Sequence, residues 1–172
     1  MGFRAESLAA RIEEGANALA AFAQKLTEEE WNTPVNEGRD DRTIGVIVHH
    51  VASMYPIEID VAKAVAAGNS VMDVSWDTVA DINAGHARDN ASATKEEALD
   101  LLRRNSRDAA AVVRGFTDAE LDRAAPFSLS YGAPMTAQFV IEDHALRHSW
   151  HHLARIRAAR SRLGSSRLAG VR

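Results

Sequence analysis

Apolar residues recur at intervals of three or four along most of this chain, and this spacing restricts its fold more than any other feature. Within residues 5–25 the spacing relates Leu8, Ile12, Ala16, Leu19 and Phe22. Side chains spaced in this way share one face of an α-helix. No segment alternates apolar and polar residues for long enough to require a sheet. The sequence therefore predicts an all-α fold.

Capping and turn residues divide the pattern into four long helices, expected at residues 5–25, 41–67, 93–116 and 135–162. The Thr-x-x-Glu pattern of a helix N-terminus occurs at 27–30, 94–97 and 117–120, and the first and last of these predict short extra helical turns. Residues 76–93 show a weaker helical pattern, whereas 34–40 and 126–134 are expected to be loops. Four long helices with unequal connections are typical of a four-helix bundle.

The length of 172 residues and the hydrophobic content of 46% predict a single domain over residues 1–172. No Asp or Glu follows Asp143, so the C-terminal part is basic although the whole chain has a formal net charge of -4. We expect residues 163–172 to be a flexible basic tail. Cations near a helix C-terminus are favourable in themselves, and no nucleic-acid motif is visible, so no nucleic-acid partner is expected.

The chain holds no run of eighteen apolar residues, and its N-terminus becomes amphipathic without the apolar stretch of a secretory signal. These features predict a cytoplasmic protein without a membrane partner. Cysteine is absent, which excludes disulfides, thiolate metal ligands and a cysteine nucleophile of the chain's own. Any thiol chemistry must therefore use a bound small molecule.

Six of the seven histidines lie in two of the predicted helices: His49 and His50 in the second, and His144, His148, His151 and His152 in the last. His86 stands apart from them. His148 and His152 are four residues apart, so they project from one helical face. Ile141, Ala145 and Ile156 share that face, and the histidine pair is therefore expected to point into the bundle.

The second helix offers two candidates with different neighbours. His50 lies in an apolar stripe with Ile47, Met54, Ile57 and Val61. The row that follows His49 contains Ser53, Pro56 and Asp60. We therefore expect His50 to point inward and keep His49 as the alternative.

Three imidazoles in one apolar interior would repel one another when protonated and would lack partners when neutral. A bound metal ion removes both difficulties, whereas a lone histidine is more often solvated or hydrogen-bonded. Imidazole ligands suit Zn, Ni, Cu and Fe, and three protein ligands leave a position open for water or substrate. The pattern predicts a divalent metal site, with Asp143 and His151 as residues that could orient its ligands.

Two segments carry a resemblance to a known family: WNTPVNEGRDDRTIGVIVHHVASMY and DHALRHSWHHLARIR. The first resembles the Trp-containing lead segment and second helix of DinB/YfiT-like proteins, and the second resembles their last helix. The resemblance covers most of residues 5–160. It implies a four-helix bundle of that type and a metal triad at His50, His148 and His152. Mycothiol-dependent isomerases of the same superfamily place a carboxylate and a histidine four apart on the last helix, so His144 with His148 is the competing assignment.

The resemblance implies a metal-dependent transferase or isomerase that acts on a small-molecule substrate with a low-molecular-weight thiol such as mycothiol or bacillithiol. Zinc or nickel is the expected ion. The alternative is a non-catalytic, metal-binding and stress-related interaction module. Leu146, Trp150 and Leu153 form a second apolar row on the last helix, which favours burial or a homodimer interface.

Two further features have structural interpretations. Trp31 and Trp150 are expected to pack in the core or in an interface. Pro56 lies inside the second helix, where it leaves the carbonyl of Ala52 without its helical partner and should kink the helix.

Overall fold

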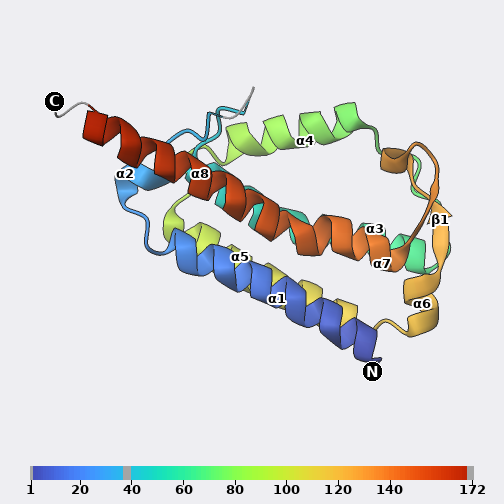
Figure 1. The fold of residues 1–172 in the computed structure, drawn as a ribbon. Coiled ribbons are helices and arrows are strands. Elements are labelled where there is room, and N and C mark those ends of the chain that lie inside the picture. Colours follow the sequence, from blue (N-terminus) through green and yellow to red (C-terminus); the bar gives the residue numbers. More distant parts are fainter. Residues whose placement is uncertain (1, 37–39, 170–172) are drawn as a thin grey trace.

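Four long helices lie side by side in the computed structural model, which describes residues 2–36 and 40–169, with side chains up to Arg162 (Figure 1). The first three are α1 (Phe3–Ala23), α3 (Ile44–Ala66) and α5 (Lys95–Arg114). The fourth is continuous but has three parts: α7 (Ala137–Ile141), a π-helical turn η2 (Glu142–Leu146) and α8 (Arg147–Ala169). The predicted all-α bundle is confirmed in its four long helices.

The remaining elements are short helices and one small hairpin. They are α2 (Glu28–Trp31), α4 (Trp76–Asp89), α6 (Asp118–Asp122), β1 (Ala124–Pro126), η1 (Ser128–Ser130) and β2 (Pro134–Thr136). The capping boxes expected at 27–30, 94–97 and 117–120 are all present. The helical pattern at 76–93 corresponds to α4, which ends at Asp89.

Two helix starts differ from the prediction, and in both cases extended pairing replaces the first helical residues. The helix expected from residue 41 begins at Ile44, because Val35 N donates to Arg42 O and Ile44 N donates to Thr33 O, both at 2.9 Å. The helix expected from residue 135 begins at Ala137, because Met135 pairs with Ala125 in the hairpin. α8 continues beyond Arg162 to Ala169; the flexibility expected for 163–172 stays a prediction, since residues 170–172 lie outside the described part.

The antiparallel pair β1–β2 was not predicted. Each strand has three residues, which is too short to show an alternating pattern in the sequence. The connection between α3 and α4 is tied to this hairpin, since Val71 N donates to Pro126 O at 2.9 Å and Ser128 N donates to Val71 O at 2.8 Å. The hairpin therefore fixes one end of the segment that leads into α4.

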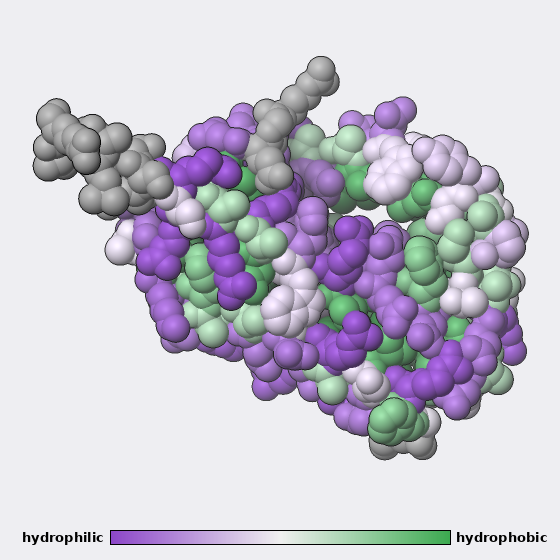
Figure 2. All heavy atoms as spheres, in the orientation of Figure 1, coloured by the Kyte–Doolittle hydropathy of each residue, from purple (hydrophilic) through white to green (hydrophobic). Residues whose placement is uncertain are grey.

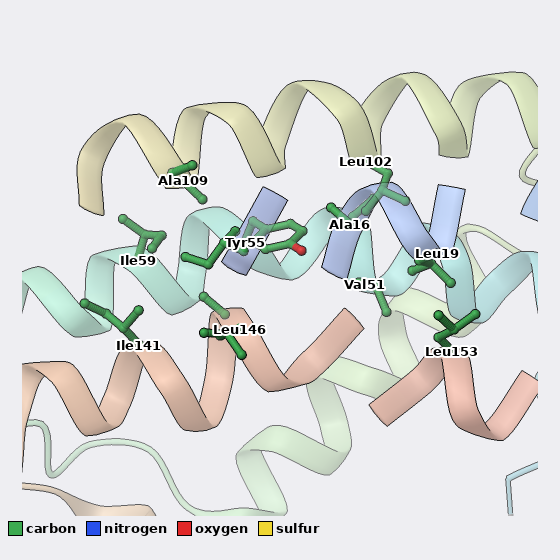
Figure 3. Packing of buried hydrophobic residues seen from close by; sticks show 14 of the residues in the cluster. Ala16, Leu19, Val51, Tyr55, Ile59, Leu102, Ala109, Ile141, Leu146 and Leu153 are labelled. Atoms are coloured by element: carbon green, nitrogen blue, oxygen red, sulfur yellow. The ribbon is translucent and has the colours of Figure 1, made fainter. Parts of the chain in front are cut away.

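The core lies between the long helices, whose apolar side chains point toward one another in Figure 3. α5 packs on α1 and α3, and the fourth helix packs on the same two helices. Tyr55, at the centre of the core, is fully buried, and its hydroxyl lies 2.7 Å from the Ser149 hydroxyl. α3 continues through Pro56, and the Asn105 side-chain amide donates at 2.8 Å to the Ala52 carbonyl. The carbonyl left without a helical partner is thus satisfied from α5.

The second apolar row of the last helix packs within this chain. Leu146 and Leu153 belong to the buried core. Trp150 is 37% exposed, and its indole lies so close to Gly15 of α1 that a Cβ there would come within 2.9 Å of Nε1. Burial against α1 accounts for the row, and the homodimer stays a prediction. No helix in the described residues is long and apolar enough to cross a membrane.

Trp31 packs on the first turn of α3, as expected for a core residue. Its indole is 3% exposed and donates to Ala93 O at 3.1 Å. Gly45 makes this packing possible, because a Cβ at that position would overlap the indole ring. By contrast, the nearest atom to a Cβ at Gly85 in α4 is the tip of Arg88, at 3.8 Å.

We therefore expect opposite effects from the same substitution in two helices. Gly45→Ala should lower the free energy of unfolding by roughly 1–3 kcal/mol, since the methyl group forces the indole out of place. Gly85→Ala should raise it by up to about 1 kcal/mol through helix propensity. Urea unfolding followed by circular dichroism measures both, and a stabilised Gly45→Ala variant would contradict the packing described above.

Candidate metal centre

His50 of α3 and His148 and His152 of α8 meet at the inner side of the bundle. The ring centroids are 5.0 Å apart for His50 and His148, 5.5 Å for His50 and His152, and 4.8 Å for His148 and His152. One ligand atom from each residue lies within 4.8 Å of the others. The structure thus brings together the three histidines that the sequence singled out.

The interior location keeps the imidazoles of His50 and His152 neutral. Burial, with the neighbouring His148 and Arg42 acting in the same direction, lowers the pKa of His50 to about 2. Burial also lowers the pKa of His152, with His148 and His50 acting in the same direction. A neutral imidazole has a free lone pair and is therefore ready to bind a metal ion.

The hydrogen bonding of the triad is incomplete among the residues that the structure describes. The Nδ1 atoms of His50 and His152 are buried and have no hydrogen-bond partner there. Leaving such atoms unpaired in a core is unfavourable. Three imidazoles that each have a buried ring nitrogen without a hydrogen-bond partner among the described residues, close enough to share one ion, fit a divalent metal by the chemistry of their donor set.

Glu58 stands beside His148, and sequence reasoning missed it. Its Oε1 lies 2.7 Å from His148 Nδ1, an ion-pair distance, although the two groups are not aligned as a hydrogen bond. A carboxylate against a ring nitrogen of a ligand histidine orients the ring. The sequence held a signal for this residue, because Glu58 is a charged residue between two isoleucines, Ile57 and Ile59.

The alternative histidines take other positions. His49 Nδ1 lies 2.9 Å from Nε2 of His86, and the Ser53 hydroxyl lies 3.2 Å from that same His86 atom. His86 also meets His50 edge to ring, with centroids 5.3 Å apart. No pattern in the sequence indicates this contact, since only the packing of α4 creates it. His49 therefore faces α4 and not the triad.

His144 and His151 border the triad without belonging to the group of mutually close ligand atoms found among the described residues. His144 lies against Phe127, with ring centroids 5.6 Å apart. Its buried Nε2 has no hydrogen-bond partner among the described residues. It lies in the π-helical turn η2, which alters its angular relation to His148 compared with a regular helix. His151 packs on the His152 ring, at 5.0 Å between centroids.

A charged cluster lies next to the triad. The Asp40 carboxylate accepts hydrogen bonds from Nε and Nη2 of Arg42, at 2.8 and 2.7 Å, and from Nη2 of Arg155, at 2.8 Å. Burial opposes ionisation of Asp40, but these hydrogen bonds outweigh it and hold its pKa well below the ordinary value. The cluster joins the segment before α3 to α8 and so helps to hold the two ligand-bearing helices together.

A cavity of about 390 Å³ opens beside the triad. Its walls come from α3, α4, the α3–α4 connection, the hairpin loop and α8. The surface in Figure 2 is hollowed between the segment that Figure 1 labels α4 and the rest of the bundle. Aliphatic and aromatic side chains share the walls with polar ones: Arg42 before α3, His50 and Glu58 of α3, Asn83 of α4, Asp143 and His144 of η2, and histidines and arginines of α8. Such a cavity can hold a small molecule against the histidines.

Comparisons with known proteins agree with this geometry. The profile described as the DinB superfamily matches residues 11–156. Among solved structures the chain is similar to YfiT from Bacillus subtilis, described as "a probable metal-dependent hydrolase with an unusual four-helix bundle topology", with a TM-score of 0.75 and 21% identity over 95% of this chain and 90% of that one. No curated protein sequence matches the chain significantly.

Removing the charge at Asp40 should weaken the fold in a pH-dependent way. Asp40→Asn should lower the free energy of unfolding by roughly 2 kcal/mol at neutral pH, since charge-assisted hydrogen bonds are lost. The Asp40 pKa is depressed in the folded state, so its contribution is complete above an ordinary carboxyl pKa of about 4 and declines as the pH falls below it. The difference from the wild type should therefore shrink in acid. Asp41→Asn, at an exposed neighbour, is the control, and an equal loss there would contradict the assignment.

Proposed function

Because this chain belongs to the DinB superfamily, we propose that it is a metal-dependent enzyme with one divalent ion at His50, His148 and His152. The observation that carries the proposal is the group of three histidines at the wall of a cavity of about 390 Å³, with ring nitrogens that have no hydrogen-bond partner among the described residues. A divalent ion held there supplies Lewis acidity, which makes a water or a thiol nucleophilic near neutral pH. Zinc and nickel suit three imidazole ligands.

The residues of the chain have separable tasks in this scheme. His50, His148 and His152 bind the ion, and Glu58 orients the His148 ring through its 2.7 Å contact. His144 presents a buried Nε2, and both it and Phe127 line the cavity, so it can hold or release a proton beside a bound substrate. The apolar walls exclude water from the reacting groups, which strengthens their electrostatic effect.

The nucleophile in this proposal is an external low-molecular-weight thiol, and the reaction is a transfer or an isomerisation. The chain has no cysteine, so a thiol nucleophile has to come from outside. The resemblance of the last helix to mycothiol-dependent isomerases supports the same choice. The cavity beside the histidines favours an enzyme over a non-catalytic interaction module, which would need the ion but no space next to it.

Hydrolysis is the second candidate. YfiT, which has the same fold, is described as a probable metal-dependent hydrolase, and three histidine ligands leave a position for water. Thiol transfer and hydrolysis share the ion and the cavity and differ only in the nucleophile. An assay that offers both nucleophiles separates them.

Metal content tests the ligand assignment directly. Replacing His50, His148 or His152 with Ala should weaken zinc binding at least about tenfold, because two imidazoles make a poorer site. Replacing His49, His144 or His151 should change it much less. Elemental analysis of untagged protein and zinc titration measure all six variants. An empty site in His49→Ala with a filled one in His50→Ala would refute the choice within α3; loss in His144→Ala with retention in His152→Ala would support the competing assignment.

Activity measurements test the proposed chemistry. Metal-loaded protein should accelerate conjugation of mycothiol or bacillithiol to an electrophilic acceptor, and complete metal removal should return the rate to that of the uncatalysed control. Ester hydrolysis without thiol, in the same preparations, is the parallel assay. Metal-dependent hydrolysis without thiol conjugation would favour the second candidate. Conjugation that persists after complete metal removal would refute the mechanism.

A further inference from the structure

We propose that the cavity beside the triad receives a small molecule with an apolar body and one carboxylate, and that Arg42 binds the carboxylate. This inference rests on the proposed function, because the molecule would occupy the substrate's place next to the histidines. It adds the chemical class of the ligand and a residue for its recognition.

The apolar body is inferred from the walls of the cavity. α3 contributes Met54 and Ile57, α4 contributes Trp76 and Ile82, and the hairpin loop contributes Phe127. Trp76 and Ile82 are 59% and 41% exposed, which is unfavourable for large apolar side chains gathered at one opening. A ligand with an apolar body would cover them.

The carboxylate is inferred from Arg42, which lines the same cavity. Its side chain is 15% exposed, and its Nη1 is buried without a hydrogen-bond partner among the described residues. A buried guanidinium nitrogen without an acceptor is costly, and carboxylates are the acceptors that guanidinium groups bind best. The Arg42 guanidinium is therefore the group of the cavity wall that we expect to pair with a ligand carboxylate.

Asp40 cannot serve as that acceptor. Its Oδ1 accepts from Arg42 Nε at 2.8 Å, and its Oδ2 accepts from Nη2 of both Arg42 and Arg155. These contacts fix the Arg42 side chain, and its Nη1 donates no hydrogen bond to the residues that the structure describes. Arg42 also lowers the pKa values of His50 and His86, which agrees with its position at the histidine end of the cavity.

Arg42 is thus a preorganised donor beside the triad, at one end of an apolar cavity. Arg147 also lines the cavity, but it is 58% exposed and its Nε lies 3.0 Å from Asp143 Oδ1. We therefore assign recognition to Arg42 and use Arg147 as the comparison.

Calorimetric titration with hydrocinnamate and its uncharged analogue hydrocinnamide tests the inference. The wild type should bind the acid at least about tenfold more tightly than the amide, both after chelator treatment and after zinc loading. Arg42→Met should abolish that preference while leaving amide binding unchanged. Arg147→Met, the matched control, should retain it. Circular dichroism verifies that the variants are folded.

Several results would overturn the inference. Equal affinity of the wild type for acid and amide, or no binding of either, refutes the inference. This result needs no variant, so it counts even if Arg42→Met does not fold. If the preference for the acid survives in Arg42→Met but disappears when the metal is removed, the metal ion and not Arg42 binds the carboxylate. Failure of the proposed function looks different: a triad that binds no metal refutes the enzyme, while the acid preference of the metal-free protein remains.

Discussion

The burial of several imidazoles among aliphatic side chains is the constraint around which this bundle is arranged. Neutral rings are favoured there, because burial and the neighbouring charges lower the pKa of His50 to about 2. Neutral rings still require partners, and the Nδ1 atoms of His50 and His152 have none among the described residues. The fold thus holds a polar group whose stability depends on something that binds it, which is the usual condition of a functional site and not of a core.

The elements outside the four long helices complete the site. The hairpin holds the α3–α4 connection through Val71. α4 then lies beside the bundle, and none of its residues, all of which the structure describes, is buried. α4 supplies one wall of the cavity and places His86 next to His49 and His50. The π-helical turn directly before α8 also shapes the site, because such a turn changes which side chains of the helix face it.

The charged side chains at the site, like the histidines, need partners, and most of them have one. Asp40 links Arg42 and Arg155, so that one carboxylate connects the start of α3 to α8. Glu58 stands at His148, and Asp143 stands at Arg147. Each of these carboxylates lies beside a particular cation or ring, and Arg42 and Arg147 also line the cavity. In the proposed function, binding of the ligand carboxylate and binding of the metal ion thus use neighbouring parts of the same cavity wall.

The sequence by itself determined the helices and the side of each helix on which the histidines lie. Both follow from local signals, namely periodic spacing and Thr-x-x-Glu caps. The apolar stripe around His50 and the i, i+4 pair His148 and His152 each specified one side of a helix. It also identified Trp31 as packing and the Ala52 carbonyl as one that needs a partner. Only the tertiary structure decided the hairpin, the Glu58 contact and the position of Arg42 in the cavity beside the triad. These depend on segments far apart in the chain, whose contacts arise from packing and leave no periodic trace in the sequence.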